Sequence, residues 1–100
     1  MASNPVRTKV YDVSGRTMLN AINDLVELQK ADVTYSDISI GKIYFRVEMY
    51  GFLWEYRFTV EDIDENHSRV TLEIRGEAMN KTEKISRQFA LLDSMLGNFK

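Results

Sequence analysis

The sequence predicts an α+β fold, a two-layer sandwich in which two helices cover one face of a five-stranded antiparallel sheet. Two adjacent stretches show the period-two alternation of half-buried strands, and amphipathic helical patterns precede and follow them. The predicted element order is β-α-β-β-β-β-α. Short connections favour a meander with the first strand beside the last one, which gives the sheet order 2-3-4-5-1. A chain of 100 residues builds one hydrophobic core. We therefore expect a single domain over residues 1–100, ordered from about residue 6 to residue 99.

The register of the central strands follows from the alternation of bulky apolar residues. These residues are Ile43, Phe45, Val47 and Met49, then Phe52, Trp54, Tyr56, Phe58 and Val60, then Val70, Leu72 and Ile74. A turn centred on Tyr50 and Gly51, with Phe58 paired to Leu72, places them all on one face. A slip of one residue would move Trp54 and Phe58 into water, so the register is strongly specified.

The other face of this sheet carries charged residues and is predicted to lie in water. The same register places Arg46 opposite Glu55, and Arg57 beside Glu73. It also brings Glu55 next to Arg75. Cross-strand pairs of opposite charge contribute roughly 0.2–1 kcal/mol each, so we expect them to support the register.

The first half of the chain supplies the remaining strands and one helix. Residues 6–13 are predicted to form an opening strand, and Ser14 is a suitable N-cap for a helix over residues 15–30. Residues 31–40 alternate weakly and predict a short edge strand. Gly41 is expected to bend the chain into the next strand.

The closing helix is predicted from an apolar row in which Ile85, Phe89, Leu92 and Phe99 recur at helical spacing. Asn80 or Thr82 is expected to cap its start. Its end is predicted near Leu96, with Gly97 as the stop. Both helices therefore have an apolar stripe that suits the apolar face of the sheet.

Composition argues against several classes of protein. The net charge of −2 and the isoelectric point of about 5.4 argue against a nucleic-acid surface, which needs a basic face. There is no cysteine, so disulfides and thiolate chemistry are excluded. No secretory signal is recognisable, and no stretch approaches the roughly 20 apolar residues that span a bilayer. We predict a cytoplasmic protein without a membrane span and without a nucleic-acid partner.

No arrangement of residues indicates catalysis. His67 lies in the connection over residues 64–68, where a hairpin tip is expected to give it neither an orienting partner nor a pocket. Asp12 and Asp37 are the nearest candidates for a carboxyl with a shifted pKa, and both are more simply explained as turn or cap residues. The sequence therefore predicts no enzyme, no catalytic residue and no cofactor.

One acidic stretch resembles a calcium-binding loop. Asp62, Asp64, Asn66 and Glu73 occupy the first, third, fifth and twelfth places of that pattern. The sixth place needs glycine for a sharp turn and holds His67 instead, and the flanking segments are predicted strands. We interpret the stretch as a polar hairpin turn and predict no metal site.

The candidate ligand-lining residues are the aromatic residues expected between the sheet and the closing helix. They are Phe45, Trp54, Tyr56, Phe58 and Phe89. One interpretation makes them the core, since each aromatic side chain buries about 150–250 Å². The other leaves a small apolar pocket under the closing helix, with Tyr56 as a polar contact for a ligand.

The element order and the hairpin run over residues 41–75 resemble the helix-grip fold. This is the superfamily of START-related lipid-transfer domains, polyketide cyclases and the birch-pollen allergen (SRPBCC-type). The resemblance extends from Thr8 to Phe99 and includes the sequence Arg69-Val70-Thr71-Leu72. It implies an apolar ligand between the sheet and the closing helix, near Phe45, Trp54, Tyr56 and Phe89. The chain is shorter than the larger members, which argues against a large ligand site. A short bacterial domain of this layout is the closer likeness.

Two functions are therefore open. The first is a non-enzymatic domain that binds a small apolar or aromatic ligand between the sheet and the C-terminal helix. The alternative is a protein–protein interaction or self-association module, which would allow a homodimer. It would act through the edge strand over residues 33–40 or through the charged sheet face at Tyr44, Arg46, Arg57 and Arg75.

Overall fold

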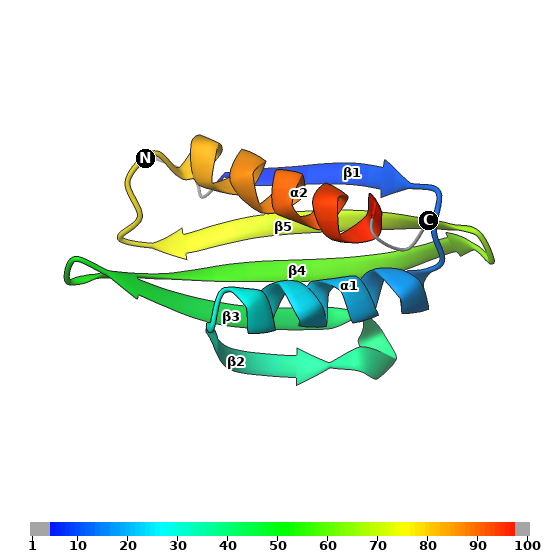
Figure 1. The fold of residues 1–100 in the computed structure, drawn as a ribbon, viewed down its shortest axis with the longest axis horizontal. Helices are drawn as coiled ribbons and strands as arrows, with labels where there is room; N and C mark the ends of the chain where they lie inside the picture. The colour runs from blue at the N-terminus through cyan, green and yellow to red at the C-terminus, as the bar shows by residue number, and fades with distance from the viewer. Residues whose placement is uncertain (1–4, 98–100) are drawn as a thin grey trace.

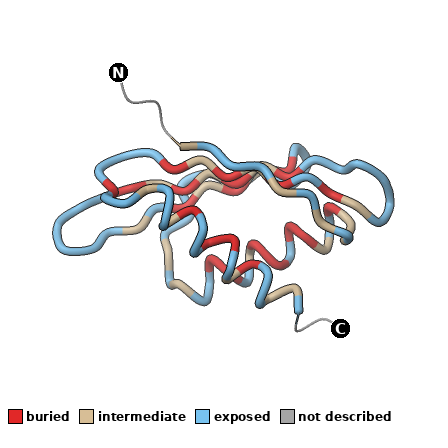
Figure 2. Tube along the Cα trace, turned by 90° about the horizontal axis from the view of Figure 1, so that it is seen from above, coloured by how far each residue is buried: buried red, intermediate tan, exposed pale blue. Residues whose placement is uncertain are grey.

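The computed structural model describes residues 5–97, and its strands and α-helices follow one another in the predicted order (Figure 1). The elements are β1 (Val6–Tyr11), α1 (Gly15–Leu28), β2 (Asp32–Asp37), the short 3-10 helix η1 (Ile38–Ile40), β3 (Lys42–Met49), β4 (Phe52–Asp64), β5 (His67–Gly76) and α2 (Lys81–Gly97). The antiparallel sheet has the order β1-β5-β4-β3-β2, which is the predicted order read from its other edge. Both helices lie on one face of it (Figure 2). The α+β fold class is confirmed.

The predicted register of the two central hairpins is confirmed. Met49 pairs with Phe52 and Val47 with Trp54 across the β3–β4 hairpin. Its turn residues Tyr50 and Gly51 have φ angles of 53° and 81°. Two positive φ angles are typical of the tight turn whose twist matches that of paired strands. On the other side of β4, Phe58 pairs with Leu72 as expected.

The hydrophobic core lies between the covered sheet face and the two helices, where buried segments from both layers face each other (Figure 2). Phe45 and Phe58 are fully buried at its centre, with ring centroids 6.0 Å apart. Met18, Ile22 and Leu25 of α1 are also fully buried. The apolar stripe of α1 therefore packs on the sheet, as its periodicity predicts.

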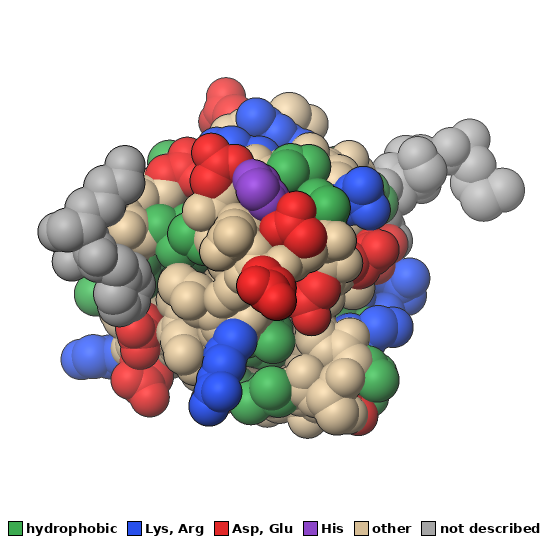
Figure 3. Space-filling model, turned by 90° about the vertical axis from the view of Figure 1, so that its right-hand side faces the viewer, with side chains coloured by type: hydrophobic (Ala, Val, Ile, Leu, Met, Phe, Trp, Pro, Cys, Tyr) green, Lys and Arg blue, Asp and Glu red, His purple; other side chains and the backbone are tan. Residues whose placement is uncertain are grey.

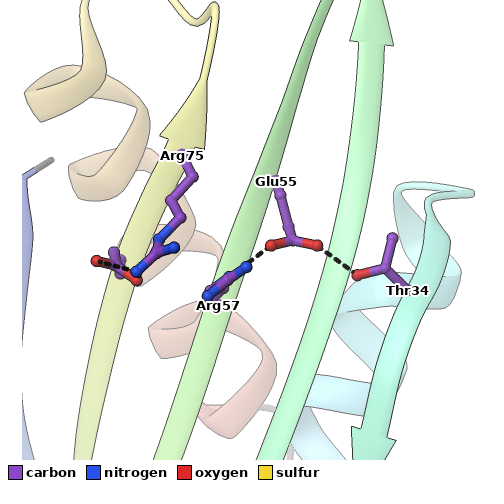
Figure 4. A network of polar contacts seen from close by, with 5 residues as sticks. Thr34, Glu55, Arg57 and Arg75 are labelled. Carbon is purple, nitrogen blue, oxygen red and sulfur yellow. Dashed lines mark hydrogen bonds and ion pairs between the residues drawn. The ribbon is translucent and has the colours of Figure 1, made fainter.

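The ion pairs of the charged face differ from the predicted ones, because two of its arginines pair along their own strands. Arg57 donates to Glu55 on its own strand, and Arg75 donates to Glu73 at 3.0 Å (Figure 4). Residues two apart on a strand share a face, so these long side chains meet without crossing to a neighbouring strand. Arg46 lies 3.7 Å from Asp32 instead of pairing with Glu55.

Glu55 is held in place by two donors from different strands. Thr34 of β2 donates a hydrogen bond to it at 2.6 Å, across β3 (Figure 4). Partial burial alone would raise the pKa of Glu55, but the hydrogen bonds from Thr34 and Arg57 hold it below its usual value. The network fixes a negative charge on the outer face of the sheet.

β1 ends at Tyr11 rather than near residue 13, and its charged side chains point towards α2. Lys9 and the Tyr11 hydroxyl each donate to a different oxygen of Asp93 at 2.8 Å. Arg7 donates to Ser86 and lies 5.4 Å from the centre of the Phe89 ring. Burial and the bond to Asp93 raise the pKa of the Tyr11 phenol. Polar groups therefore attach α2 to the edge strand.

The helix ends largely follow the predicted caps. The Ser14 hydroxyl accepts a hydrogen bond from the Thr17 amide at 3.2 Å, which confirms the N-cap of α1. α1 ends at Leu28, short of the predicted Lys30, whose φ of 53° cannot continue the helix. α2 begins directly after Asn80.

Two further expectations concern the edge and the chain end. Gly41 makes the predicted bend, with a φ of 70°, and the Asp37 carboxylate accepts a hydrogen bond from the Ser39 amide at the start of η1. The predicted apolar contact of Phe99 lies outside the described residues. Within residues 5–97, neither α1 nor α2 has the length and apolar composition needed to cross a membrane.

Candidate functional site

A cleft of about 360 Å³ opens between the sheet and α2, where the β3–β4 hairpin extends past the end of α1 (Figure 1). We call it the tryptophan cleft. It is lined by Leu28, Gln29, Val47, Met49, Trp54, Tyr56, Lys84, Arg87, Gln88 and Leu91. The hairpin is longer than the helix above it, so the inner side chains near its tip are only partly covered.

Trp54 forms one wall of the tryptophan cleft and carries a buried donor. Its side chain is 7% exposed, and its buried indole N–H has no hydrogen-bond partner among the described residues. An indole N–H can only donate, and a buried donor without an acceptor costs about 1–3 kcal/mol. The nitrogen atom itself is covered, so an acceptor in the cleft would recover this cost only if the ring shifts.

Gln29 and Gln88 close the inner end of the cleft with a reciprocal pair of hydrogen bonds. Each side-chain amide donates to the other, at 2.9 Å from Gln29 and 2.7 Å from Gln88. Gln88 is 3% exposed. The pair links α1 to α2 through a polar contact inside an apolar layer, and a pair satisfied in this way is stable there.

Tyr56 lines the cleft next to the core. Its ring lies 5.2 Å from that of Phe45, and burial raises the pKa of its phenol. The hydroxyl is therefore neutral at physiological pH and can both donate and accept a hydrogen bond.

The rim of the cleft continues onto an exposed apolar surface at the hairpin tip. We call this surface the hairpin rim. It consists of Met49, Tyr50, Phe52 and Met79, which together with Trp54 and Lys84 surround a further hollow of about 230 Å³. Tyr50 is 92% exposed and Met79 is 66% exposed. Methionine adapts its shape readily, so this rim suits the entry of apolar molecules.

The structure separates the five predicted ligand-lining residues into two groups. Trp54 and Tyr56 line the tryptophan cleft. Phe45, Phe58 and Phe89 are buried in the core and do not line it. Three of the predicted residues therefore belong to the core, and the other two line a cleft.

Sequence reasoning missed the polar residues of the cleft. They are Gln29 and Gln88 at its inner end, with Lys84 and Arg87 on α2. The two glutamines had a signal, since each occupies the apolar row of its helix. Gln88 lies three residues after Ile85 and four before Leu92, both of which are buried. A polar residue in such a row needs a partner, and each glutamine provides one for the other.

A second cavity of about 650 Å³ lies at the opposite end of α1. We call it the Asp62 cavity, and its lining is Gly15, Arg16, Leu19, Asn20, Ile38, Ser39, Ile40, Gly41, Val60, Glu61 and Asp62. The Asp62 carboxylate accepts a hydrogen bond from the Gly15 amide at 3.1 Å. An anion at this place neutralises a free amide at the start of the helix.

His67 has acidic neighbours, which corrects the expectation that a hairpin tip gives it no partner. At this end of the molecule, acidic side chains gather around the histidine (Figure 3). One ring nitrogen lies 2.7 Å from Asp64 and the other 3.4 Å from Asp12. The hydrogen bond with Asp64 raises the pKa of His67. The side chain is still 43% exposed at the surface.

Comparison with known proteins identifies the fold. No protein-family model and no curated protein matches the chain. Among solved structures, the chain is similar to BexL, a di-domain ARO/CYC protein of a biosynthetic pathway, with 10% identity and a TM-score of 0.69. The match covers 96% of this chain and 47% of BexL, so the chain spans about half of that protein's length.

Two further structures match most of the chain at lower similarity. An aromatase/cyclase from a Streptomyces species is 10% identical, with a TM-score of 0.47 over 96% of this chain and 92% of its own. A START superfamily protein from Mycobacterium smegmatis is 12% identical, with a TM-score of 0.41 over 97% and 93%. Of these three structures, BexL carries the fold argument, because its TM-score is above 0.5. The predicted resemblance to the helix-grip fold is confirmed at the level of the fold.

The same comparison corrects the expectation that the protein is not an enzyme. That expectation was based on the lack of a recognisable catalytic motif. The fold is shared with BexL, a di-domain ARO/CYC protein of a biosynthetic pathway. The exclusion of enzymatic activity is therefore wrong, because a biosynthetic ARO/CYC protein has the same fold.

Proposed function

We propose that the protein binds a small, mainly apolar aromatic molecule in the tryptophan cleft, between the sheet and α2. The observation that carries the proposal is the buried indole N–H of Trp54. It makes no hydrogen bond of good geometry among the described residues, although the Tyr56 hydroxyl is near enough for the indole to act on the pKa of that phenol. The cleft around it is lined by apolar and aromatic side chains together with Gln29, Gln88, Lys84 and Arg87. Ligand sites are typically concave and apolar with a few converging polar groups, and this cleft has that composition.

The volume of the cleft sets the size of the ligand. Binding pockets for small molecules span about 300–1,000 Å³, and about 360 Å³ lies near the lower limit. A molecule of one or two fused rings fits this volume, whereas a long lipid does not. The fully buried Phe45 and Phe58 prevent the cleft from deepening towards the centre of the core.

The fold comparison supports the choice of ligand class. BexL is described as an ARO/CYC protein and shares this arrangement of a sheet and a closing helix. Aromatic ring systems are therefore the first compounds to test, and the fate of the compound should be followed as well as its binding.

The test is a titration of the protein with neutral and anionic aromatic compounds of one and two rings, followed by calorimetry and by the fluorescence of Trp54. We expect saturable binding at a ratio of one to one and a change in Trp54 emission. Mass spectrometry of the recovered compound reports any chemical conversion. Failure of every compound to bind the folded protein would contradict the proposal.

A matched pair of variants tests the location of the site. Val47→Phe places a ring inside the cleft and is expected to weaken binding at least about tenfold. Leu53→Phe adds the same ring on the opposite face of the hairpin and should leave affinity unchanged. Equal affinities for the two variants would show that the compound binds elsewhere.

A second candidate function is self-association along β2, and the exposure of its edge favours it. Val33, Ile38 and Ile40 are each more than half exposed beside this edge of the sheet, and no strand within residues 5–97 pairs with the outer side of β2. Unpaired edges accept further strands. Sedimentation should then show a dimer that Val33→Lys converts to a monomer, whereas a monomeric wild-type protein at high concentration would contradict the idea.

The cytoplasmic location and the bacterial source stay predictions from the sequence.

A further inference from the structure

The charged residues of the tryptophan cleft are all of one sign. Its lining includes Lys84 and Arg87 and no aspartate or glutamate. The two cations lie three residues apart on α2, so they project from the same side of the helix. An empty cleft of this composition presents positive charge next to an apolar wall.

Neither cation is neutralised by a carboxylate among the residues that the structure describes. Lys84 donates one hydrogen bond to the Met79 carbonyl at 2.7 Å, and its ammonium lies 5.1 Å from the centre of the Trp54 ring. Arg87 is exposed at the rim. Its charge acts against the effect of burial on the pKa of the Tyr56 phenol, which also lines the cleft. Both groups keep donors available for a ligand.

The unsatisfied groups around the cleft are therefore donors. The Trp54 indole, the Lys84 ammonium and the Arg87 guanidinium can donate and cannot accept hydrogen bonds. The amides of Gln29 and Gln88 are already paired with each other. A ligand that satisfies this set needs an acceptor-rich group, and hydrogen bonds to a charged acceptor are about twice as strong as those to a neutral one.

We propose that the tryptophan cleft selects aromatic carboxylates over neutral aromatic compounds of the same shape. The ring would pack against the apolar wall, and the carboxylate would lie towards Lys84 and Arg87 within reach of the Trp54 indole. This inference depends on the proposed function, since it specifies the ligand of the same site.

The experiment compares 2-naphthoate with 2-naphthamide, which have the same ring and nearly the same shape but differ in charge. We expect naphthoate to bind about tenfold more tightly at low salt, and this advantage to shrink as ionic strength rises. The chain contains a single tryptophan. Its indole N–H therefore gives one resonance in a nitrogen-edited NMR spectrum, which should move downfield when a carboxylate accepts its hydrogen bond.

Charge-neutral variants separate the contribution of the cleft from general attraction. Arg87→Gln and Lys84→Gln should each weaken naphthoate binding about fivefold, an effect of the size measured for partly exposed ion pairs. They should weaken naphthamide binding much less, because a neutral amide gains less than a carboxylate from a nearby cation. Lys81→Gln removes a positive charge from the same helix outside the cleft and should alter neither affinity.

The outcomes distinguish the two proposals. If naphthamide binds as tightly as naphthoate, or if Lys81→Gln has the same effect as Arg87→Gln, the selection for carboxylates is overturned and the aromatic site stands. If neither compound binds the folded wild-type protein, the proposed function fails as well.

Discussion

The two hollows on the helix-covered side of the sheet differ in chemistry although one strand contributes to both. The inner side chains of β4 run in order from Trp54 and Tyr56 in the tryptophan cleft to Val60 and Asp62 in the Asp62 cavity. Phe58 lies between them and lines neither. A single alternating strand thus places aromatic side chains at one end and a carboxylate at the other.

The comparison shows what distinguishes a free site from a satisfied one. The Asp62 carboxylate already accepts the Gly15 amide, so the polar group at that end has a partner within the protein. The Trp54 indole N–H has none among the described residues. The Asp62 cavity is larger, but its carboxylate already has a partner within the protein. It is therefore the weaker candidate for a ligand site.

The largest effect is expected from removing the residue that separates the two hollows. Phe58→Ala should lower the free energy of unfolding by about 3–5 kcal/mol, because it deletes a fully buried ring. Urea denaturation measures the loss. Phe52→Ala is the control, since Phe52 is 43% exposed on the hairpin rim and should cost far less. Similar losses for both variants would show that the stability of the core does not depend on the Phe58 ring.

The next largest effect concerns how closely the backbone packs at the Asp62 cavity. A Cβ atom on Gly41 would lie 2.2 Å from the Val60 carbonyl oxygen, and its φ of 70° already disfavours other residues. Gly41→Ala should therefore cost about 3 kcal/mol. Gly51 at the opposite hairpin has a φ of 81° with nothing within 4 Å, so Gly51→Ala should cost only about 1 kcal/mol. Thermal unfolding measures the loss of stability in each variant. Equal losses would show that the close contact with Val60 contributes nothing.

A smaller effect is expected from the amide pair of the tryptophan cleft. Gln88→Leu alone leaves Gln29 without its partner and should cost about 1–2 kcal/mol. The double variant Gln29→Leu with Gln88→Leu removes both polar groups and should recover part of that loss. A double-mutant cycle from urea denaturation is expected to give a coupling of about 1 kcal/mol. Additive losses would mean that the pair makes no joint contribution.

The smallest effect on stability is expected from the contact between His67 and Asp64. The hydrogen bond with Asp64 raises the pKa of His67 above its usual value of 6.5. A raised pKa in the folded state gives stability that is present below about pH 6.5 and is lost as the pH rises through the folded-state pKa. The bond with His67 also lowers the pKa of Asp64, so its contribution disappears as the pH falls through that lowered pKa. The hairpin contact is therefore strongest between the two pKa values.

An NMR titration of the His67 ring tests this interpretation. Asp64→Asn should return the His67 midpoint to near its usual value, and Asp12→Asn should shift it less, because Asp12 is the smaller cause. An unchanged midpoint in Asp64→Asn would contradict the assignment.

The sheet was predictable from the sequence because only one register places its alternating apolar residues on a single face. Trp54 and Phe58 could not both be buried after a shift of one residue, and Tyr50 with Gly51 marked the turn. The charge pairs were not predictable in the same way. Arg57 and Arg75 are long enough to choose among several carboxylates, and they pair along their own strands.

The cleft could be predicted only in part, because its walls depend on where one helix ends and how the other crosses the sheet. Trp54 and Tyr56 followed from strand alternation. The contribution of Lys84 and Arg87 required the position of α2 on the sheet, which their spacing does not give. The face of β1 that meets the helices was equally hard to predict, since its alternating residues include Val6 and Val10, which lie exposed on the outer face.

The edge strand β2 has a consequence for the motions of the protein. None of its side chains is buried, and its pairing with β3 is interrupted by a bulge between Val33 and Tyr35. Little apolar contact would be lost if it peeled away, because it is held by backbone pairing and by exposed side-chain contacts of Thr34 with Glu55, Asp32 with Arg46 and Tyr35 with Tyr44. Its amide protons should therefore exchange with heavy water long before those of β4, and the sheet would open from this side while its interior stays closed.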